Sequence, residues 1–250
     1  MMNVNETYQK FADYYDAYAG AFDKDLAFYT SLCRPDEKIL EVGCGTGRVL
    51  QRFLNDGFQI TGVDISDEML AVAKQKLASF CHSGNLVILH HNFFEHPLPE
   101  VYDRVLVTWF TFNYILETPE NFLKNLVASM DSQAMLAMDV FYPRTFTNPN
   151  VNDVWTTRQL TYHGRVITVQ DKRTVSGDME ERIQIYRENG KETHIHTRRK
   201  YYPPHILKQL LECAGLMEIM FSEQYESNAF KPTLEEHEIV EHFVVNAKKP

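Results

Sequence analysis

The feature that most constrains the fold is a short apolar run followed by glycines at every second position, over residues 38–50. The apolar residues within 39–42 predict a buried strand, and those within 49–54 recur at helical spacing. Glycines between the two adopt dihedral angles closed to other residues, and they let a ligand approach the backbone. The first N–H groups of the following helix are free to bind that ligand. The stretch therefore predicts a strand, a ligand-binding loop and a helix.

The glycine spacing separates three kinds of nucleotide-binding loop. A dinucleotide loop would place its third glycine where this chain has Arg48, so an NAD-dependent oxidoreductase is a disfavoured alternative. A P-loop ends in Gly-Lys-Ser or Gly-Lys-Thr, which this stretch does not contain. The pattern E-x-G-x-G-x-G instead resembles the first motif of class I methyltransferases that use S-adenosylmethionine (SAM). This resemblance implies SAM as cofactor, S-adenosylhomocysteine as product, and cofactor contacts from Glu41, Gly43, Cys44, Gly45 and Gly47.

A second strand pattern, residues 58–64, ends in an acid, Asp64. In a doubly wound sheet, an acid at this point accepts hydrogen bonds from the ribose hydroxyls of a nucleotide. Capping the next helix is the alternative role, but Ser66 is the better cap for a helix over 66–80. We therefore expect Asp64 to bind the ribose, and the resemblance implies further cofactor contacts from Ile65 and Met69.

The third strand pattern, residues 86–90, is followed by the position at which the family usually carries an acid for the adenine amino group. Asn92 stands there, and its side-chain oxygen can accept the same hydrogen bond, while Phe93 would contact the ring. The fourth strand pattern resembles the family's fourth-strand motif and brings Thr108 and Trp109 to the cofactor. An aromatic ring there would attract the sulfonium by roughly 0.5–2 kcal/mol.

Aromatic residues crowd the first helical segment, which spans residues 3–33. Phe11, Tyr14, Tyr15 and Tyr18 fall at i, i+3, i+4 and i+7 and so share one helix face. Packing against the core is one interpretation. Methyltransferases of this family often begin with a tyrosine-rich helix over the cofactor, so the resemblance implies that Tyr14 and Tyr18 contact cofactor or substrate.

Methyl transfer from a sulfonium depends chiefly on orientation, which can supply about 7–11 kcal/mol of barrier reduction. A base is needed mainly when the acceptor is a hydroxyl or a charged amine. We name Tyr14, Tyr114 and His163 as candidate catalytic residues, with structural packing as the alternative for each.

The pattern of apolar and polar residues changes after residue 141. Segments 155–162, 166–175, 179–186 and 194–201 alternate in polarity and are separated by glycine-containing turns, which predicts an antiparallel sheet. Family resemblance implies a lid over the acceptor site, whereas the exposed strand edges are equally consistent with the surface of a homodimer.

The predicted fold is a doubly wound α/β, Rossmann-like sheet of seven strands with an antiparallel last strand, plus a small antiparallel β insert. Residues 1–141 and 202–250 would form the SAM-binding core with its N-terminal helical cap, and 142–201 the insert. The last two strands are expected at 217–222 and 237–247.

Composition excludes several classes of function. The formal net charge of −9 argues against nucleic acid as a partner, because phosphate binding needs a basic face. Four scattered cysteines and the neighbouring His90 and His91, which alternate across a strand, give no metal site. The chain has no apolar leader and no apolar run of about 20 residues, so we expect a cytoplasmic protein without membrane contact.

These observations predict a SAM-dependent methyltransferase that acts on nitrogen or oxygen of a small polar metabolite. Nitrogen is favoured because the insert resembles those of N-methyltransferases of amines and amino sugars. A SAM-binding regulatory or partner subunit without catalytic activity is the alternative. The identity of the acceptor is not encoded in a transferable motif, because sites are grafted onto folds.

Overall fold

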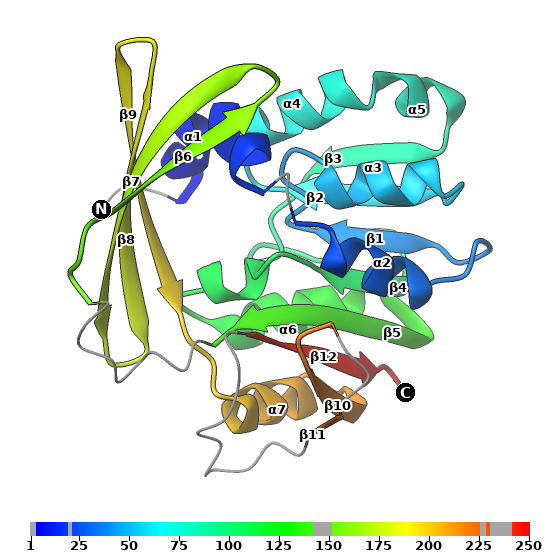
Figure 1. Cartoon of the computed structure of the whole chain (residues 1–250). Helices are drawn as coiled ribbons and strands as arrows, with labels where there is room; N and C mark the ends of the chain where they lie inside the picture. Colours follow the sequence, from blue (N-terminus) through cyan, green and yellow to red (C-terminus); the bar gives the residue numbers. More distant parts are fainter. Residues whose placement is uncertain (1–3, 20–21, 143–151, 226–228, 231–241) are drawn as a thin grey trace.

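The computed structural model describes residues 4–19, 22–142, 152–225, 229–230 and 242–250. A larger α/β unit carries a smaller antiparallel sheet at one side (Figure 1). Among the described residues, no helix is long and apolar enough to cross a membrane.

The larger unit is built on a mixed sheet with the strand order β11-β10-β12-β5-β4-β1-β2-β3. Strands β1 to β5 run parallel, and β12 is antiparallel to both of its neighbours. The seven predicted strands and the antiparallel last strand are confirmed, and the short β11 adds one more at the edge. The strands are β1 Ile39–Val42, β2 Ile60–Asp64, β3 Leu86–His90, β4 Tyr102–Val107, β5 Met130–Phe141, β10 Met217–Glu223, β11 Ala229–Phe230 and β12 His242–Lys248.

Helices cover both faces of this sheet. They are α1 Val4–Ala19, α2 Lys24–Ser31, α3 Arg48–Asn55, α4 Asp67–Lys76, α5 Ala78–Ser83, α6 Pro119–Ala128 and α7 Pro204–Cys213, with a 3₁₀ helix η1 at Thr111–Tyr114. Proline opens α6 and α7, where its missing N–H costs nothing.

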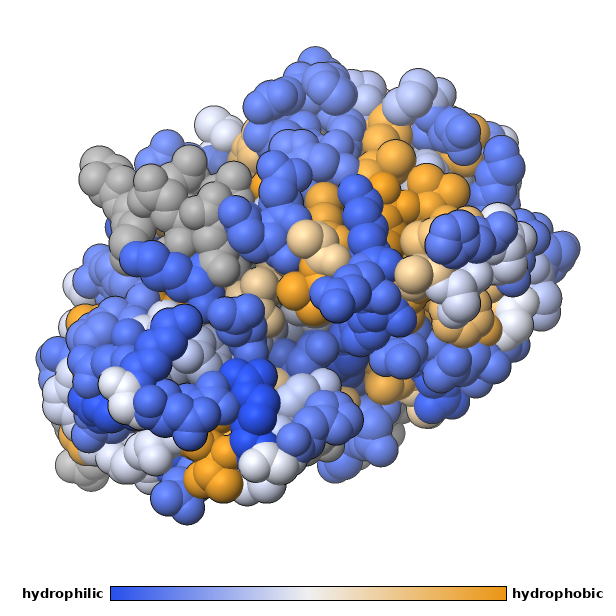
Figure 2. Space-filling model, turned by 90° about the horizontal axis from the view of Figure 1, so that it is seen from above, coloured by the Kyte–Doolittle hydropathy of each residue, from blue (hydrophilic) through white to orange (hydrophobic). Residues whose placement is uncertain are grey.

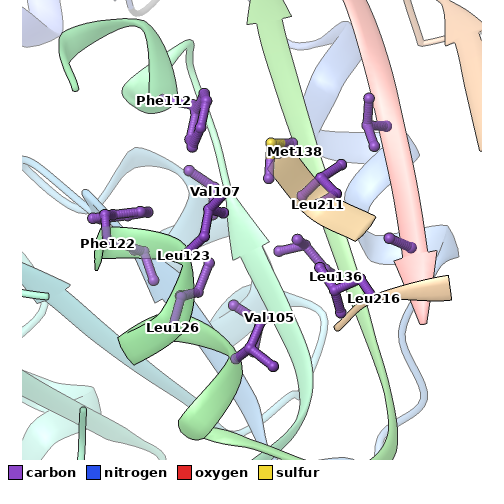
Figure 3. Packing of buried hydrophobic residues seen from close by; sticks show 14 of the residues in the cluster. Val105, Val107, Phe112, Phe122, Leu123, Leu126, Leu136, Met138, Leu211 and Leu216 are labelled. Atoms are coloured by element: carbon purple, nitrogen blue, oxygen red, sulfur yellow. The ribbon is translucent and has the colours of Figure 1, made fainter. Parts of the chain in front are cut away.

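Two apolar cores lie on opposite faces of the sheet, because successive strand residues point to opposite sides. Val105 and Val107 belong to one core, and Leu106 between them belongs to the other. Figure 3 shows the first core, in which Leu126 of α6 lies toward β4 and Leu211 of α7 lies near β5. The second core is formed with α2, α3 and α5. Both faces of the sheet are therefore covered by packed helices. The edge formed by the carboxyl ends of its parallel strands remains available to a ligand.

The insert is a four-stranded antiparallel sheet with the order β6-β7-β8-β9. Its strands are β6 Thr156–Tyr162, β7 Arg165–Ser176, β8 Met179–Glu188 and β9 Lys191–Lys200, close to the predicted segments. The turn at His163-Gly164 has φ of 47° and 77°, and that at Asn189-Gly190 has 50° and 78°. Positive φ at both central positions fits two-residue hairpin turns, so the turn residues predicted this sheet correctly.

Helix α1 lies between the insert and the core (Figure 1). Phe11 and Tyr14 of α1 share an apolar cluster with Met69 of α4 and with Ile167 and Tyr186 of the insert. The tyrosine-rich face therefore joins the two units.

Two predicted helical segments differ from the structure, and the start of the last predicted strand lies outside the residues that it describes. The helix expected over 66–80 is two helices, because at Leu77 the backbone has φ −108° and ψ 20°. The first helical segment likewise forms α1 and α2. Strand β12 begins at His242, and the earlier part of the expected last strand lies outside the described residues.

Candidate active site

A cavity of about 420 Å³ lies at the carboxyl ends of β1, β2 and β4, between the core and the insert. Residues of the larger unit form its core wall, and residues of β7, β8 and β9 form the opposite side, which we call the insert wall. The core wall contains Val42, Gly43, Gly45, Val63, Asp64, Ile65, Met69, His91, Asn92, Phe93, Phe94, Trp109, Phe110, Thr111, Tyr114, Ile115, Phe122 and Phe141. The insert wall contains Arg173, Arg182, Gln184, Thr197 and Arg199, and α1 adds Phe11, Tyr15 and Tyr18.

The glycine loop needs glycine for two separate reasons. Gly43 has φ of 73°, and a Cβ there would lie 2.5 Å from Thr111 Oγ1, so any side chain would clash. At Gly45, with φ of 53°, the nearest atoms to a Cβ belong to the Tyr15 ring at 3.9 Å. Gly43 thus fits the loop against the segment after β4, whereas Gly45 leaves its backbone open to the cavity.

Asp64 ends β2 and fixes the loop while it faces the cavity. One carboxylate oxygen accepts from the Gly45 N–H at 2.8 Å, and the other accepts from the Ser66 N–H at 2.9 Å. Burial raises the pKa of Asp64 above its ordinary value, although these backbone hydrogen bonds oppose the shift. Ser66 caps α4 by accepting from the Met69 N–H at 3.3 Å, as predicted. Asp64 is therefore not the helix cap, and its ribose role stays a prediction.

Glu41 lies behind the loop and does not line the cavity. Its Oε1 accepts from the Thr108 hydroxyl at 2.7 Å, while its buried Oε2 has no hydrogen-bond partner among the described residues. Burial raises the pKa of this carboxyl to about 8. Glu41 and Thr108 thus tie β1 to the end of β4, and one buried acceptor is left unused.

The segment after β4 turns sharply at two aromatic residues. Trp109 and Phe110 have φ of 54° and 61°, which is an uncommon conformation for bulky side chains and is typical of functional sites. The Arg48 guanidinium lies 4.5 Å from the centre of the Trp109 ring and pairs with the buried Asp25. The residue that breaks the dinucleotide pattern therefore anchors α2 and supports Trp109.

Asn92 and Phe93 line the cavity, as the adenine prediction requires. The Asn92 side-chain oxygen, however, already accepts from the Phe94 N–H at 3.0 Å, and its amide donates to Glu95 at 2.9 Å. The oxygen has one lone pair left for a ligand.

Two of the predicted catalytic residues lie elsewhere. Tyr14 is 2% exposed and stacks on Tyr186, so it packs α1 against the insert. His163 lies in the exposed β6–β7 turn. Neither lines the cavity, whereas Tyr114 does. The predicted cofactor residues that lie outside the lining are Glu41, Cys44, Gly47 and Thr108; Gly47 is the N-cap of α3.

Tyr18 faces the insert wall rather than only the cofactor side. Its hydroxyl accepts from Arg182 Nη1 at 2.8 Å, and the Arg158 guanidinium lies 5.0 Å from its ring centre. Although burial alone would raise it, the charge and hydrogen bond of Arg182 lower the pKa of Tyr18 below its ordinary value.

The sequence analysis missed the five residues of the insert wall. They are the inward-facing members of alternating strands, so the alternation placed them on one face, but nothing in it indicated that this face meets the cavity.

Part of the sequence is similar to known methyltransferases. A family described as methyltransferase domain matches residues 40–136. A methyltransferase of Geobacillus sp. (strain WCH70) is 33% identical over 128 residues, which are 46% of this chain and 48% of that protein. A malonyl-[acyl-carrier protein] O-methyltransferase of Anoxybacillus flavithermus is 31% identical over 143 residues, 56% of this chain and 50% of that protein. The alignments thus span about half of these relatives or less.

Solved structures resemble the whole chain. The CcbJ methyltransferase of Streptomyces caelestis aligns with a TM-score of 0.77 at 18% identity, over 97% of this chain and 98% of that one. An amino pentose methyltransferase of Micromonospora echinaspora, solved with SAM bound, has a TM-score of 0.70 at 17% identity, over 95% and 96% of the two chains. A sugar N-methyltransferase of Streptoalloteichus has a TM-score of 0.65 at 18% identity, over 92% and 91%. The chain therefore shares its fold with these SAM-dependent methyltransferases, and its residues 40–136 match the methyltransferase domain family.

Proposed function

We propose that this protein transfers a methyl group from SAM to a nitrogen or oxygen atom of a small polar metabolite. The observation that carries the proposal is that one cavity joins the glycine loop and Asp64 to the polar insert wall. Such a cavity can hold a cofactor at one end and an acceptor at the other.

The core wall fits the chemical groups of SAM. Asp64 offers carboxylate oxygens to ribose hydroxyls, and Gly45 exposes backbone to the cavity. The rings of Tyr15, Trp109 and Phe110 line the same region, where they suit a positively charged sulfur. When bound, SAM would supply a methyl carbon already activated by its sulfonium.

The chain itself would mainly orient the acceptor and exclude water. Helix α1 and the insert cover the carboxyl edge of the sheet, and Tyr18 and Tyr114 bring hydroxyl groups to the cavity. We assign to Tyr18 the role of taking the proton that the acceptor loses, because Arg182 donates to its oxygen and would stabilise the negative charge. Tyr114 would orient the acceptor.

Nitrogen is the favoured acceptor atom. Two of the structural neighbours are described as N-methyltransferases of a sugar and of a glycopeptide, and a third as an amino pentose methyltransferase. The O-methyltransferase among the sequence relatives keeps oxygen open.

The test is the formation of S-adenosylhomocysteine from SAM with a panel of amines, amino sugars, amino acids and carboxylic acids. We expect turnover with at least one acceptor and a methylated product by mass spectrometry. Tyr18→Phe should lower kcat by roughly 100-fold and change the pH–rate profile, as expected for loss of a general base. Tyr162→Phe, in the β6 strand and outside the cavity lining, is the matched control. SAM binding without turnover across the whole panel would favour a regulatory subunit instead.

A further inference from the structure

The insert wall is an ordered set of side chains on one face of a sheet. Arg173 of β7 lies directly opposite Arg182 of β8, which lies opposite Thr197 of β9. The next row ends in Glu180 and Arg199. Because side chains at paired positions share a face, the guanidinium groups of three strands converge on the cavity that they line.

The charges on this face do not balance. Arg182 donates through Nε to the two Asp171 oxygens at 2.8 and 3.1 Å, and Arg199 donates through Nε to Glu180 at 2.9 Å. These two carboxylates flank Arg173, but each is already bonded to another arginine. No salt bridge or side-chain hydrogen bond joins Arg173 to another residue that the structure describes, and its charge acts on Asp171 and Glu180 only from a longer distance. Three arginines thus share two carboxylates, which leaves one positive charge in excess at the cavity.

An anionic ligand would improve this arrangement of charges. Like charges directly opposite each other in a sheet are destabilising, and Arg173 faces Arg182 across the β7–β8 ladder. An anion at this point would remove the repulsion. Arginine binds carboxylate and phosphate oxygens through paired N–H donors, so these groups match it geometrically.

A second, independent observation comes from Gln184. Its side chain is 3% exposed and lines the cavity one row from Arg173, yet its amide Nε2 has no hydrogen-bond partner among the described residues. A buried donor without a partner costs about 1–3 kcal/mol. The diagonal position across the ladder lets both side chains reach one ligand. Guanidinium and amide N–H groups together offer donors to an oxygen-rich group.

We propose that the insert wall binds an oxyanion of the methyl acceptor, a carboxylate or a phosphate, through Arg173 and the side-chain amide of Gln184. That the ligand is the methyl acceptor rests on the proposed function, whereas the anion site does not. With its anionic group bound there, the acceptor would point its reactive atom toward the glycine loop at the other end of the cavity. The substrate class is thus a small metabolite with an acidic group and a separate nucleophilic atom.

NMR of the arginine Nε–H and glutamine side-chain amide groups tests the site without cofactor or turnover. The full chain is titrated with inorganic phosphate or with acetate, against sodium chloride at equal ionic strength. We expect saturable shifts of the Arg173 and Gln184 signals, and the anion that binds tighter identifies the source as phosphate or carboxylate. Non-saturable shifts, or equal shifts with chloride, would overturn the proposal.

Two substitutions of Arg173 make the test specific. Arg173→Gln should abolish the saturable shift of Gln184, while Arg173→Lys should retain weak binding through its charge. Arg198→Gln is the matched control, because Arg198 lies on the opposite face of the insert and pairs with Glu181 at 3.5 Å. Unchanged anion binding in Arg173→Gln would contradict the assignment.

A kinetic measurement links the site to the acceptor. With an acidic acceptor found in the panel, Arg173→Gln should lower kcat/KM by about 10- to 100-fold, mostly through KM, and leave SAM affinity unchanged. The same variant should not affect a neutral analogue of that acceptor. If the wild-type protein does not bind SAM, the proposed function is refuted. The anion site is not, because the anion titration tests it without SAM.

Discussion

The core wall of the cavity presents a carboxylate, glycine backbone and aromatic rings, whereas the insert wall presents guanidinium groups held by a β-sheet. The difference extends to the surface: seen from above, apolar surface gathers on the core side, while the insert side is mostly hydrophilic (Figure 2). Because the two walls carry opposite charges, a cofactor and an acceptor bound between them can have only one orientation. Groups that donate hydrogen bonds or carry positive charge belong against the core, and an anionic group belongs against the insert.

The two walls also differ in what holds them in place. On the core wall, Asp64 is held by backbone N–H groups at the end of a strand that is part of the central sheet. On the insert wall, buried arginines depend on buried carboxylates. A substitution on the core wall should therefore have a local effect, whereas removing one charge from the insert wall should strongly lower the free energy of unfolding.

The largest effect is expected from Glu180→Ala. Glu180 is 1% exposed and accepts from both Arg199 and the Tyr201 hydroxyl. Removing it leaves the Arg199 charge buried without a partner, which should lower the free energy of unfolding by about 3–5 kcal/mol. Chemical denaturation measures this loss. Glu181→Ala, on the opposite exposed face, is the control and should change stability by less than about 1 kcal/mol.

Glu180→Ala also tests whether the walls are independent. At temperatures where the variant is folded, its SAM affinity should equal that of the wild type, because no residue of the core wall contacts Glu180 through a hydrogen bond in the described part of the chain. A large loss of SAM affinity would mean that the two walls are coupled.

Asp64→Ala should act on the core wall alone. We expect SAM affinity to fall by about 1–3 kcal/mol, the loss typical of a charged hydrogen-bond acceptor. Titration calorimetry measures it, with Asp67→Ala in the exposed first turn of α4 as the matched control. Saturable anion binding at Arg173 should persist in both variants. Wild-type SAM affinity in Asp64→Ala would remove Asp64 from the ribose role.

A further effect concerns pH and Glu41. Burial raises the pKa of its carboxyl to about 8 in the folded chain, above the unfolded value near 4.3. The folded state thus binds the proton more tightly than the unfolded state. The contribution of the protonated Glu41 to the free energy of unfolding is therefore complete below the unfolded pKa. It is lost as pH rises toward 8, by at most about 1.4 kcal/mol per pH unit. Glu41→Gln should flatten the decline in unfolding free energy between pH 5 and 8.

Glu37→Gln is the control of opposite sign. Although burial opposes the shift, hydrogen bonds from Arg104 and the Arg34 backbone lower the pKa of Glu37. Its contribution is therefore lost on acidification, and the variant should alter the acid side of the stability curve instead. Equal pH profiles for the Glu41 variant and the wild type would contradict a neutral buried Glu41.

The sequence predicted those parts of the core wall that depend on local signals. The glycine spacing, the acid at the end of the second strand and the Ser66 cap each depend on a few neighbouring residues, and the structure places Gly43, Gly45 and Asp64 on one cavity. The insert hairpins were equally predictable, because Asn189-Gly190 and similar turns carry their own conformational signal.

The insert wall was not predictable for a physical reason. Strand alternation places Arg173, Arg182 and Arg199 on one face, but which face meets the core depends on how α1 packs between the two units. The same tertiary arrangement buries Tyr14 against Tyr186 and turns Tyr18 toward Arg182. Those contacts join segments more than a hundred residues apart, so local patterns carry no information about them.

The most direct test of the central claim is calorimetric titration of the wild-type protein with SAM and S-adenosylhomocysteine, with NAD as control. We predict micromolar binding of both adenosyl compounds with one site per chain, and no heat from NAD. Absence of adenosyl binding, or tighter binding of NAD, would contradict the assignment of the core wall as a SAM site.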